Sequence, residues 1–419
     1  MITGSSRRKK LALVLTVVAS LLERGRSEAR DPDLSPSEIQ QIQGEVQQLE
    51  RLLPKAVDPA EITYILAADN SRLGNKAAML GWLKKLEAMN SGYDIHGDLN
   101  LRRFASDPEV QRIAQRMHAR VPEVHRSELA FQLAEKDLIP EGVAFDPITH
   151  DLYLSSINKR KIVRINPSGE FHDFISTGQD GIGETLGMKV EPKSHTLWVC
   201  SALEYGPSVG WSGVFHYDLA SGKLIKKYTV EPKPQQHLFN DLAISSAGDI
   251  YLTDSSAGLV YQILHDRDLL EPIQEMPKLG YPNGIAISHD DKKLYIAHFN
   301  GGVTLFDLVS RKAKLLPHPE SVTLAEIDGL YFVRNTLIGI QNGIGAARVS
   351  RFFLNASGDR VERAEILEDH SPYMEIPTTG APAGDEFYFS GSSQGNLWHD
   401  GKITDPAKLK PAYILRMKL

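Results

Sequence analysis

Four side chains that carry oxygen atoms hold the same place in a repeated pattern, directly before a short apolar run. They are Glu141, Asn240, Asn283 and Asp328. Two carboxylates and two amides, with no sulfur and no imidazole, form the ligand set that a hard cation prefers. Calcium suits this set better than magnesium because it accepts about 6–8 oxygen ligands in irregular geometry. The pattern therefore predicts one Ca²⁺ ion, provided that the fold brings the four residues together.

Each of these residues also has an ordinary structural explanation. Asn283-Gly284 and Asp328-Gly329 are dipeptides typical of turns, because Asn and Gly tolerate a positive φ. Glu141 is compatible with a surface position and Asn240 with a loop. Their shared position relative to four strands favours the metal site, because turn residues have no reason to keep that register.

Three further polar residues lie close to this pattern in the sequence. Asp241 follows Asn240 and is expected to support the ligands from behind. His237 precedes Asn240 by three residues, and His298 ends a predicted strand. Each imidazole is a candidate substrate contact or base if it reaches the site, although a lone histidine is more often structural.

The elements that carry these residues are predicted to be β-strands. From about residue 127, short alternating or apolar runs recur between Gly, Asp, Asn and Pro, which is the pattern of an all-β fold. The positions directly before the first run of each repeat are spaced by 43 to 54 residues: Glu141, Leu186, Asn240, Asn283, Asp328 and Thr379. A repeat of about 40–50 residues with four strands is a propeller blade. Residues 127–419 are thus predicted to form a six-bladed β-propeller whose innermost strands meet at one axis.

The last repeat is too short to supply all of its own strands after residue 391. A propeller must close into a ring, and an incomplete blade would leave a strand edge exposed. The extended segment Ser127–Leu138 precedes the first repeat and is the candidate for the missing outer strand. This pairing would also join the preceding helical region rigidly to the ring.

Residues 36–126 are predicted to be helical. Apolar residues recur at helical spacing over three segments, Ile39–Leu53, Pro59–Leu73 and Lys76–Met89. A fourth helix is expected after Asp107, with that residue as its N-cap. The helices on either side of Gly74 resemble one degenerate tetratricopeptide-like (TPR-like) unit. One unit is too little for a peptide-binding stack, which needs about three repeats, so we expect a helical cap, with protein-partner binding as the alternative.

The N-terminus has the layout of an export signal. The basic segment Arg7–Lys10 precedes an uncharged apolar run over Leu11–Leu22, which is too short for a comfortable membrane span. Residues 1–29 are predicted to be a signal peptide and residues 30–35 a linker. An exported protein, periplasmic or secreted, is therefore expected, and an uncleaved membrane anchor is the alternative.

The composition limits the classes of partner. The 419-residue chain has a formal net charge of −6 and no long basic run after residue 10. A nucleic-acid partner is not expected, because phosphate binding needs a basic surface. Cys200 is the single cysteine, which excludes an internal disulfide and a cysteine-based zinc cluster.

Four motifs around the predicted ligands resemble the SMP-30/gluconolactonase family, which is related to the paraoxonases. The motifs are Pro140-Glu-Gly-Val-Ala-Phe-Asp146, Phe239-Asn-Asp-Leu-Ala243, Pro282-Asn-Gly-Ile-Ala286 and Ile327-Asp-Gly-Leu330. The resemblance covers roughly residues 127–419. It implies that Glu141, Asn240, Asn283 and Asp328 hold a catalytic calcium in the central channel, and that Asp328 acts as base or nucleophile.

Two residues depart from the pattern of that family. Leu238 stands where sugar-lactone members often have an arginine, and Leu186 stands where paraoxonases place a catalytic histidine. Neither change touches a predicted metal ligand. The resemblance therefore implies the metal site without implying a particular substrate.

Two classes of function follow from this reading. The first is a calcium-dependent hydrolase of a lactone or related ester, in which the cation polarises the carbonyl and Asp328 is the base or nucleophile. The alternative is a non-catalytic calcium-binding propeller that acts as a binding or scaffold module. A strictosidine-synthase-like condensing enzyme would need no metal and a glutamate catalyst, and the four-oxygen set argues against it.

Overall fold

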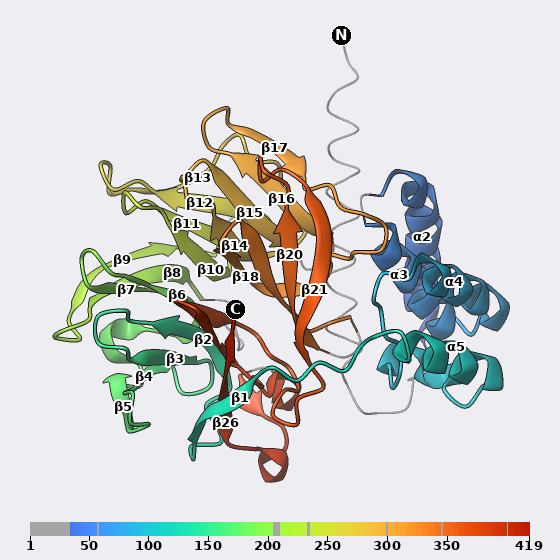
Figure 1. Ribbon diagram of the computed structural model, residues 1–419, viewed down its shortest axis with the longest axis horizontal. Helices are drawn as coiled ribbons and strands as arrows, with labels where there is room; N and C mark the ends of the chain where they lie inside the picture. Colours follow the sequence, from blue (N-terminus) through green and yellow to red (C-terminus); the bar gives the residue numbers. More distant parts are fainter. Residues whose placement is uncertain are drawn as a thin grey trace.

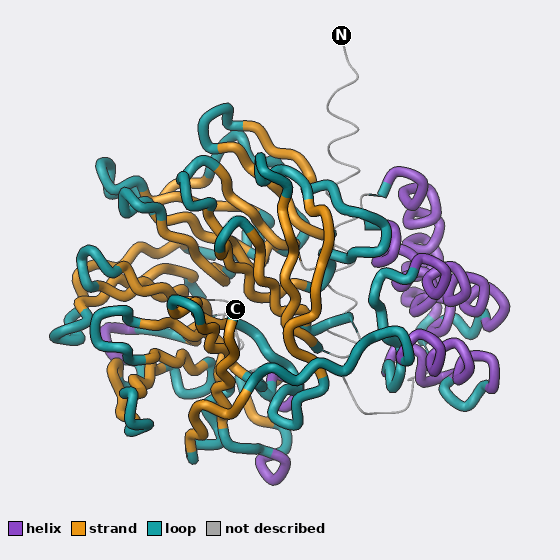
Figure 2. The backbone as a smooth tube through the Cα atoms, viewed as in Figure 1, coloured by secondary structure: helices purple, strands orange, loops and turns teal. Residues whose placement is uncertain are grey.

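The computed structural model describes residues 34–419 except residues 57, 204–209, 233–234, 299–300, 345–346 and 400. Over these residues the chain forms six four-stranded antiparallel sheets around a common axis, with helices to one side (Figure 1 and Figure 2). The predicted six-bladed β-propeller with N-terminal helices is therefore confirmed. The predicted signal peptide, and most of the linker, lie outside the described residues. None of the described helices combines the length and the apolar character needed to cross a membrane.

Five blades are each built from four consecutive strands that pair antiparallel with their neighbours. The first blade is β2 (Pro140–Phe145), β3 (Leu152–Ser156), β4 (Lys161–Ile165) and β5 (Phe171–Ile175). The second is β6 (Glu184–Glu191), β7 (Thr196–Ala202), β8 (Ser212–Asp218) and β9 (Leu224–Val230). The third is β10 (Phe239–Ile244), β11 (Ile250–Asp254), β12 (Leu259–Ile263) and β13 (Leu270–Pro272). The fourth is β14 (Pro282–Ile287), β15 (Lys293–His298), β16 (Gly302–Asp307) and β17 (Lys312–Leu315). The fifth is β18 (Ile327–Val333), β19 (Thr336–Gln341), β20 (Arg348–Leu354) and β21 (Val361–Asp369).

The sixth blade closes the ring with strands from both ends of the propeller. Its strand order is β1-β26-β23-β22, where β1 spans Glu128–Leu133, β26 Ala412–Lys418, β23 Glu386–Ser390 and β22 Gly380–Ala383. The outermost strand β1 pairs antiparallel with β26, so the prediction that Ser127–Leu138 supplies this strand is confirmed. A short hairpin, β24 (Trp398–His399) and β25 (Lys402–Ile403), lies between β23 and β26 in the sequence.

Apolar side chains between neighbouring blades form the propeller core. Between the second and third blades, for example, Trp198 and Cys200 pack with Leu242 and Ile250. Cys200 is fully buried in this layer, which gives it a packing role. The innermost strands of successive blades contact one another around the whole ring, from β2 through β6, β10, β14, β18 and β22 back to β2.

The N-terminal region is helical where the sequence predicts it. Its elements are α2 (Pro36–Leu52), the 3₁₀ turn η2 (Leu53–Lys55), α3 (Pro59–Arg72), α4 (Lys76–Met89), the 3₁₀ turn η3 (Leu99–Phe104) and α5 (Pro108–His118). Ser35 caps α2 in a capping box, and Asp107 caps α5 as expected. Gly74 has φ +77° in the turn between α3 and α4. The helix–turn–helix is thus present, and its TPR-like identity stays a prediction.

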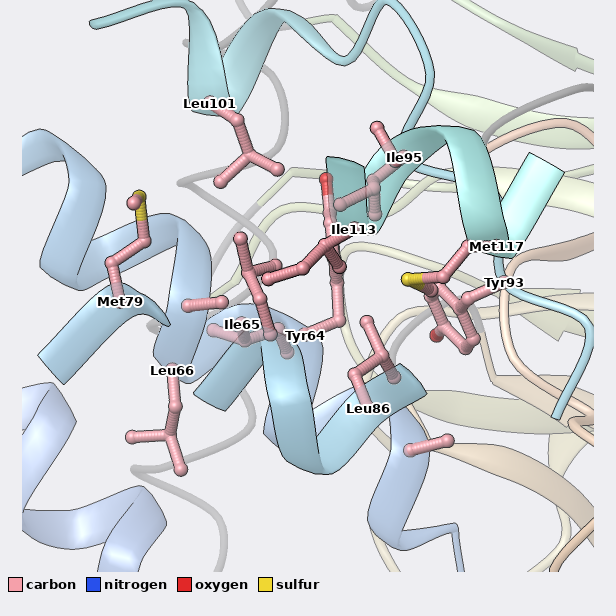
Figure 3. Close-up of a cluster of buried hydrophobic side chains, with 14 of the residues drawn as sticks. Tyr64, Ile65, Leu66, Met79, Leu86, Tyr93, Ile95, Leu101, Ile113 and Met117 are labelled. Atoms are coloured by element: carbon pink, nitrogen blue, oxygen red, sulfur yellow. The ribbon is translucent and has the colours of Figure 1, made fainter. Parts of the chain in front are cut away.

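The helical core continues onto the propeller. Side chains of α3, α4, η3 and α5 converge in one apolar cluster, and Figure 3 shows Leu66, Met79 and Ile113 within it. Ala325 and Ile344, which belong to loops of the fifth blade, are buried in the same cluster. The helices therefore share a core with the loops that flank β18 and β19.

Candidate metal centre

Five innermost strands contain a β-bulge at the same place. The pairing with the second strand of each blade shifts between Pro140 and Val143, Thr185 and Met188, Phe239 and Leu242, Pro282 and Ile285, and Ile327 and Leu330. The bulged segments hold Glu141, Leu186, Asn240, Asn283 and Asp328. A bulge bends the strand and re-aims a side chain, and such bulges often lie beside functional sites. The four predicted ligands thus occupy structurally equivalent positions.

Glycine follows most of these positions because neighbouring inner strands approach closely there. A Cβ on Gly142 would lie 2.2 Å from the Leu186 carbonyl oxygen, and one on Gly284 would lie 2.4 Å from the Asp328 carbonyl oxygen. Hydroxyl groups complete the contact between blades. The Ser155 hydroxyl accepts the Gly142 N–H (2.6 Å) and donates to the Leu186 carbonyl (2.8 Å).

The structure corrects the sixth position of the ring. A Cβ on Gly329 would lie 2.9 Å from the Thr378 carbonyl oxygen, which corresponds to the contacts between the earlier blades. Thr378, and not the predicted Thr379, is therefore the equivalent residue. Both hydroxyls donate to the Glu141 carbonyl, at 2.9 and 2.7 Å. The sequence placed this position one residue late because the glycine that marks the bulge in other blades stands further on here, at Gly380.

The predicted ligands are buried close to the axis. Each is only 6–8% exposed. Asn283 Nδ2 donates to Asp328 Oδ1 at 2.8 Å, which joins the fourth and fifth blades. Asn240 Nδ2 donates to the Ser255 hydroxyl at 3.0 Å, so its amide oxygen is the atom that it offers to a cation.

The charge of this cluster fits a cation. Burial raises the pKa of Glu141 well above its ordinary value, and the nearby carboxylates of Asp328 and Asp241 raise it further. A divalent ion bound beside them would stabilise the ionised carboxylates and lower their pKa. The donor set holds only oxygens, from two carboxylates and two amides, which matches a hard divalent cation. The residues present therefore fit the predicted ion.

Asn342 is a neighbour of Asp328 that sequence reasoning missed. Its Nδ2 donates to Asp328 Oδ2 at 2.6 Å and to the Pro377 carbonyl at 3.0 Å. Both carboxylate oxygens of Asp328 are thus held by amide groups, from Asn283 and Asn342. The sequence carries no signal for this contact, because Gln341-Asn342-Gly343 has the form of an ordinary turn.

Asp241 stands where the other four bulges have glycine. Its Oδ1 accepts the Lys189 ammonium (2.9 Å) and the N–H of Leu242 (2.8 Å), and the residue is 1% exposed. Lys189 Nζ also lies 5.1 Å from the ring centroid of Tyr331, on the fifth blade. The Asp241 charge is therefore paired inside the ring, close enough to Glu141 to affect its pKa.

The two candidate histidines have different surroundings. His237 Nδ1 lies 2.5 Å from Asp254 Oδ2, and the same buried aspartate accepts the N–H groups of Leu238 and Ala257. His298 is 5% exposed, and burial lowers its pKa to about 4. Its Nε2 makes no hydrogen bond to any residue that the structure describes. Asp254 ends β11, and His298 ends β15 in the next blade. Each pairs with the residue that precedes a bulge, Phe239 for Asp254 and Pro282 for His298. Both therefore lie at the end of the propeller that holds the predicted ligands.

A cavity of about 1030 Å³ opens at the other end of the propeller. It is lined by the turns that join first and second strands, including Ser245, Asp290 and Arg334. None of the predicted ligands lines it. The cavity and the ligand ring are therefore separate features.

The comparisons with known proteins agree with the motifs. Residues 139–329 match the sequence profile described as SMP-30/Gluconolactonase/LRE-like region. Comparison with curated proteins gives no match.

Solved structures similar to this chain share little sequence with it. A gluconolactonase of Xanthomonas campestris is 16% identical with a TM-score of 0.49, over 71% of this chain and 97% of that one. A calcium-binding regucalcin of Agrobacterium tumefaciens is 15% identical with a TM-score of 0.48, over 69% and 93%. A PQQ-bound aldose sugar dehydrogenase of Streptomyces coelicolor is 16% identical with a TM-score of 0.49, over 71% and 99%. By its sequence profile, the chain carries an SMP-30/gluconolactonase/LRE-like region, which confirms the resemblance that its four motifs indicated.

Proposed function

We propose that this protein is a calcium-dependent hydrolase of lactones or related esters. The observation that carries the proposal is the set of equivalent bulges, in which Glu141, Asn240, Asn283 and Asp328 hold the same position on four inner strands. The match to the SMP-30/gluconolactonase/LRE-like profile supports it. When bound there, Ca²⁺ would polarise the substrate carbonyl and stabilise the negative charge that develops on its oxygen.

Asp328 is the proposed base or nucleophile. Its two oxygens accept hydrogen bonds from Asn283 and Asn342, so the carboxylate plane is fixed relative to the other ligands. A carboxylate bound to Ca²⁺ would be a weak base. Its contribution must therefore come from placement beside the reacting carbonyl.

His237 is the second candidate for the base, and one observation favours it. Hydrogen bonding to Asp254 can fix the imidazole tautomer with the proton on Nδ1, which leaves Nε2 as the proton acceptor. If His237 is the base, His237→Gln should reduce turnover at least about a hundredfold. A loss below about threefold would leave Asp328 as the candidate.

The first test combines chelation with a substitution. Activity is screened on a panel of lactones and aryl esters before and after removal of divalent ions. Asp328→Asn keeps an oxygen ligand but removes the basic carboxylate. We expect turnover to fall by about 10²–10⁴-fold while Ca²⁺ still binds. Activity that survives exhaustive chelation would rule the proposal out, and Ca²⁺ binding without activity on any substrate would favour the binding-module alternative.

The predicted environment of the protein belongs to the same proposal. Export to the periplasm or beyond would place the ring where free calcium is abundant, and identification of the mature N-terminus after expression would test it.

The helices already bury apolar side chains against loops of the fifth blade. This arrangement supports the cap role over a docking role for a protein partner.

A further inference from the structure

The junction between the helices and the propeller brings together three side chains that can bind a metal. Asp94 lies after α4, His118 ends α5, and His370 directly follows β21. One ligand atom from each lies within 4.8 Å of the other two. Two imidazole nitrogens and one carboxylate thus converge from three segments that are distant in the sequence.

The surrounding backbone fixes this cluster. Asp94 is 4% exposed, its N–H lies 3.5 Å from the Ile344 carbonyl, and its Oδ1 accepts the His96 N–H at 2.9 Å. His370 has φ +52°, a left-handed conformation that is uncommon for residues other than glycine. The His370 ring meets the His118 ring edge-on, with centroids 5.6 Å apart.

A simple ion pair explains only part of the cluster. Asp94 Oδ2 lies 2.8 Å from His118 Nδ1, as in a paired carboxylate and imidazole. His370 Nδ1 is buried and lies 3.1 Å from Asp369 Oδ1, but the contact does not have the geometry of a hydrogen bond. A buried imidazole nitrogen without a hydrogen bond normally needs an explanation, and a bound ion is one.

We propose that Asp94, His118 and His370 form a site for a borderline divalent cation such as Zn²⁺. An N₂O donor set suits zinc, nickel or cobalt better than calcium, which prefers oxygen ligands. Two ligand atoms of a tetrahedral zinc site lie roughly 3.4 Å apart. Here His118 Nδ1 and Asp94 Oδ2 are 2.8 Å apart, and all three ligand atoms lie within 4.8 Å of one another, so the zinc separation falls within the observed range. Small side-chain rotations would therefore complete the site, with water in the remaining position.

The proposed ion would tie the helical region to the fifth blade. Asp94 and His118 belong to the helical region, whereas His370 belongs to the propeller. Asp369 and Arg348 also face the cluster with opposite charges, and Arg348 donates to the Gly92 carbonyl at 2.6 Å. The metal would thus reinforce a junction that hydrogen bonds already hold.

The test is a calorimetric Zn²⁺ titration of the untagged, full-length protein after metal removal. Saturating Ca²⁺ is present throughout, so that the oxygen ligands of the channel are occupied by their preferred ion. His118→Gln and His370→Gln each remove one nitrogen ligand, and His172→Gln alters an exposed histidine on β5 as the matched control. Circular dichroism verifies that each variant is folded.

The expected result is one Zn²⁺ per chain for the wild type and for His172→Gln. Affinity should fall by at least about tenfold in each of the other two variants. Co²⁺ in place of Zn²⁺ should give visible absorption bands that these two variants lose. A wild-type protein that binds no stoichiometric Zn²⁺, or a folded His118→Gln or His370→Gln variant with unchanged affinity, would overturn the proposal.

Discussion

Asp328 illustrates how neighbouring residues define a candidate catalytic group. Amide donors from β14 and from the turn after β19 hold its two oxygens, at 2.8 and 2.6 Å. An unconstrained carboxylate would rotate among several conformations, whereas a catalytic or ligating group must be held in one geometry. The close approach of neighbouring inner strands, which requires glycine, sets the frame for this arrangement.

Gly142→Ala tests that close approach. Its Cβ would lie 2.2 Å from the Leu186 carbonyl oxygen, so the strands must separate. We expect a loss of about 1–3 kcal/mol in the free energy of unfolding, measured by urea denaturation. Gly44→Ala in α2 meets no atom within 4 Å, and it should instead stabilise the protein by about 0.5–1 kcal/mol. Equal effects of the two substitutions would show that the strand contact is not limiting.

Asp69 in α3 predicts a pH dependence of stability. Burial and the nearby Glu45 raise its pKa from 3.8 to about 7. Between these values the folded protein holds a proton that the unfolded chain has lost, so this group makes stability fall as the pH rises. Asp69→Asn should flatten that slope and stabilise the protein above pH 7 by a few kcal/mol, on the order given by linkage. Denaturation curves across this range that coincide with the wild type would contradict the prediction.

At the scale of elements, Asp58 couples α3 to the fifth blade. Its Oδ1 caps α3 by accepting the N–H groups of Ala60 and Glu61. Its Oδ2 accepts the Thr323 hydroxyl (2.7 Å) and the Leu324 N–H (3.1 Å), which lie in the loop before β18. One carboxylate therefore fixes a helix end and a propeller loop together.

Asp58→Ala should destabilise the protein by about 2–3 kcal/mol, because it removes a cap and leaves buried donors without partners. Hydrogen exchange at Leu324 should also become faster. Asp107→Ala removes the cap of α5 and an exposed ion pair with Lys76, and on the order of 1 kcal/mol is expected. A cost for Asp58→Ala no greater than this control would mean that the junction does not depend on the carboxylate.

The sequence predicts elements well where the pattern is local. Strand periodicity and repeat spacing identified the blades, and caps such as Asp107 marked helix starts. Ring closure by β1 was also predictable, because the last repeat lacked a strand. The sixth inner position was predicted at Thr379, one residue late, because the glycine that directly follows this position in four other inner strands stands one residue further on here, at Gly380. Asn342 and the Asp94 cluster could not be predicted, because they depend on how distant segments dock.

At the scale of the whole molecule, closure turns a repeated sequence into one site. The inner strands contact one another around the full ring, and β1 completes the sixth blade. Residues separated by more than a hundred positions thereby become neighbours, since Asp328 lies close enough to Glu141 to raise its pKa. The helices share a core with loops of the fifth blade, next to the strand that bears Asp328. The positions of the predicted ligands therefore depend on the closure of the ring.

Calorimetric titration of Ca²⁺ into the metal-free, full-length protein tests this arrangement most directly. The structure predicts one Ca²⁺ per chain, and an affinity that falls at least about tenfold in Glu141→Gln, because one of two ligand charges is lost. Asp359→Asn, in the turn between β20 and β21 of the fifth blade, should bind as the wild type does. Absence of stoichiometric binding, or equal affinity in Glu141→Gln and the wild type, would contradict a calcium ion at the centre of the ring.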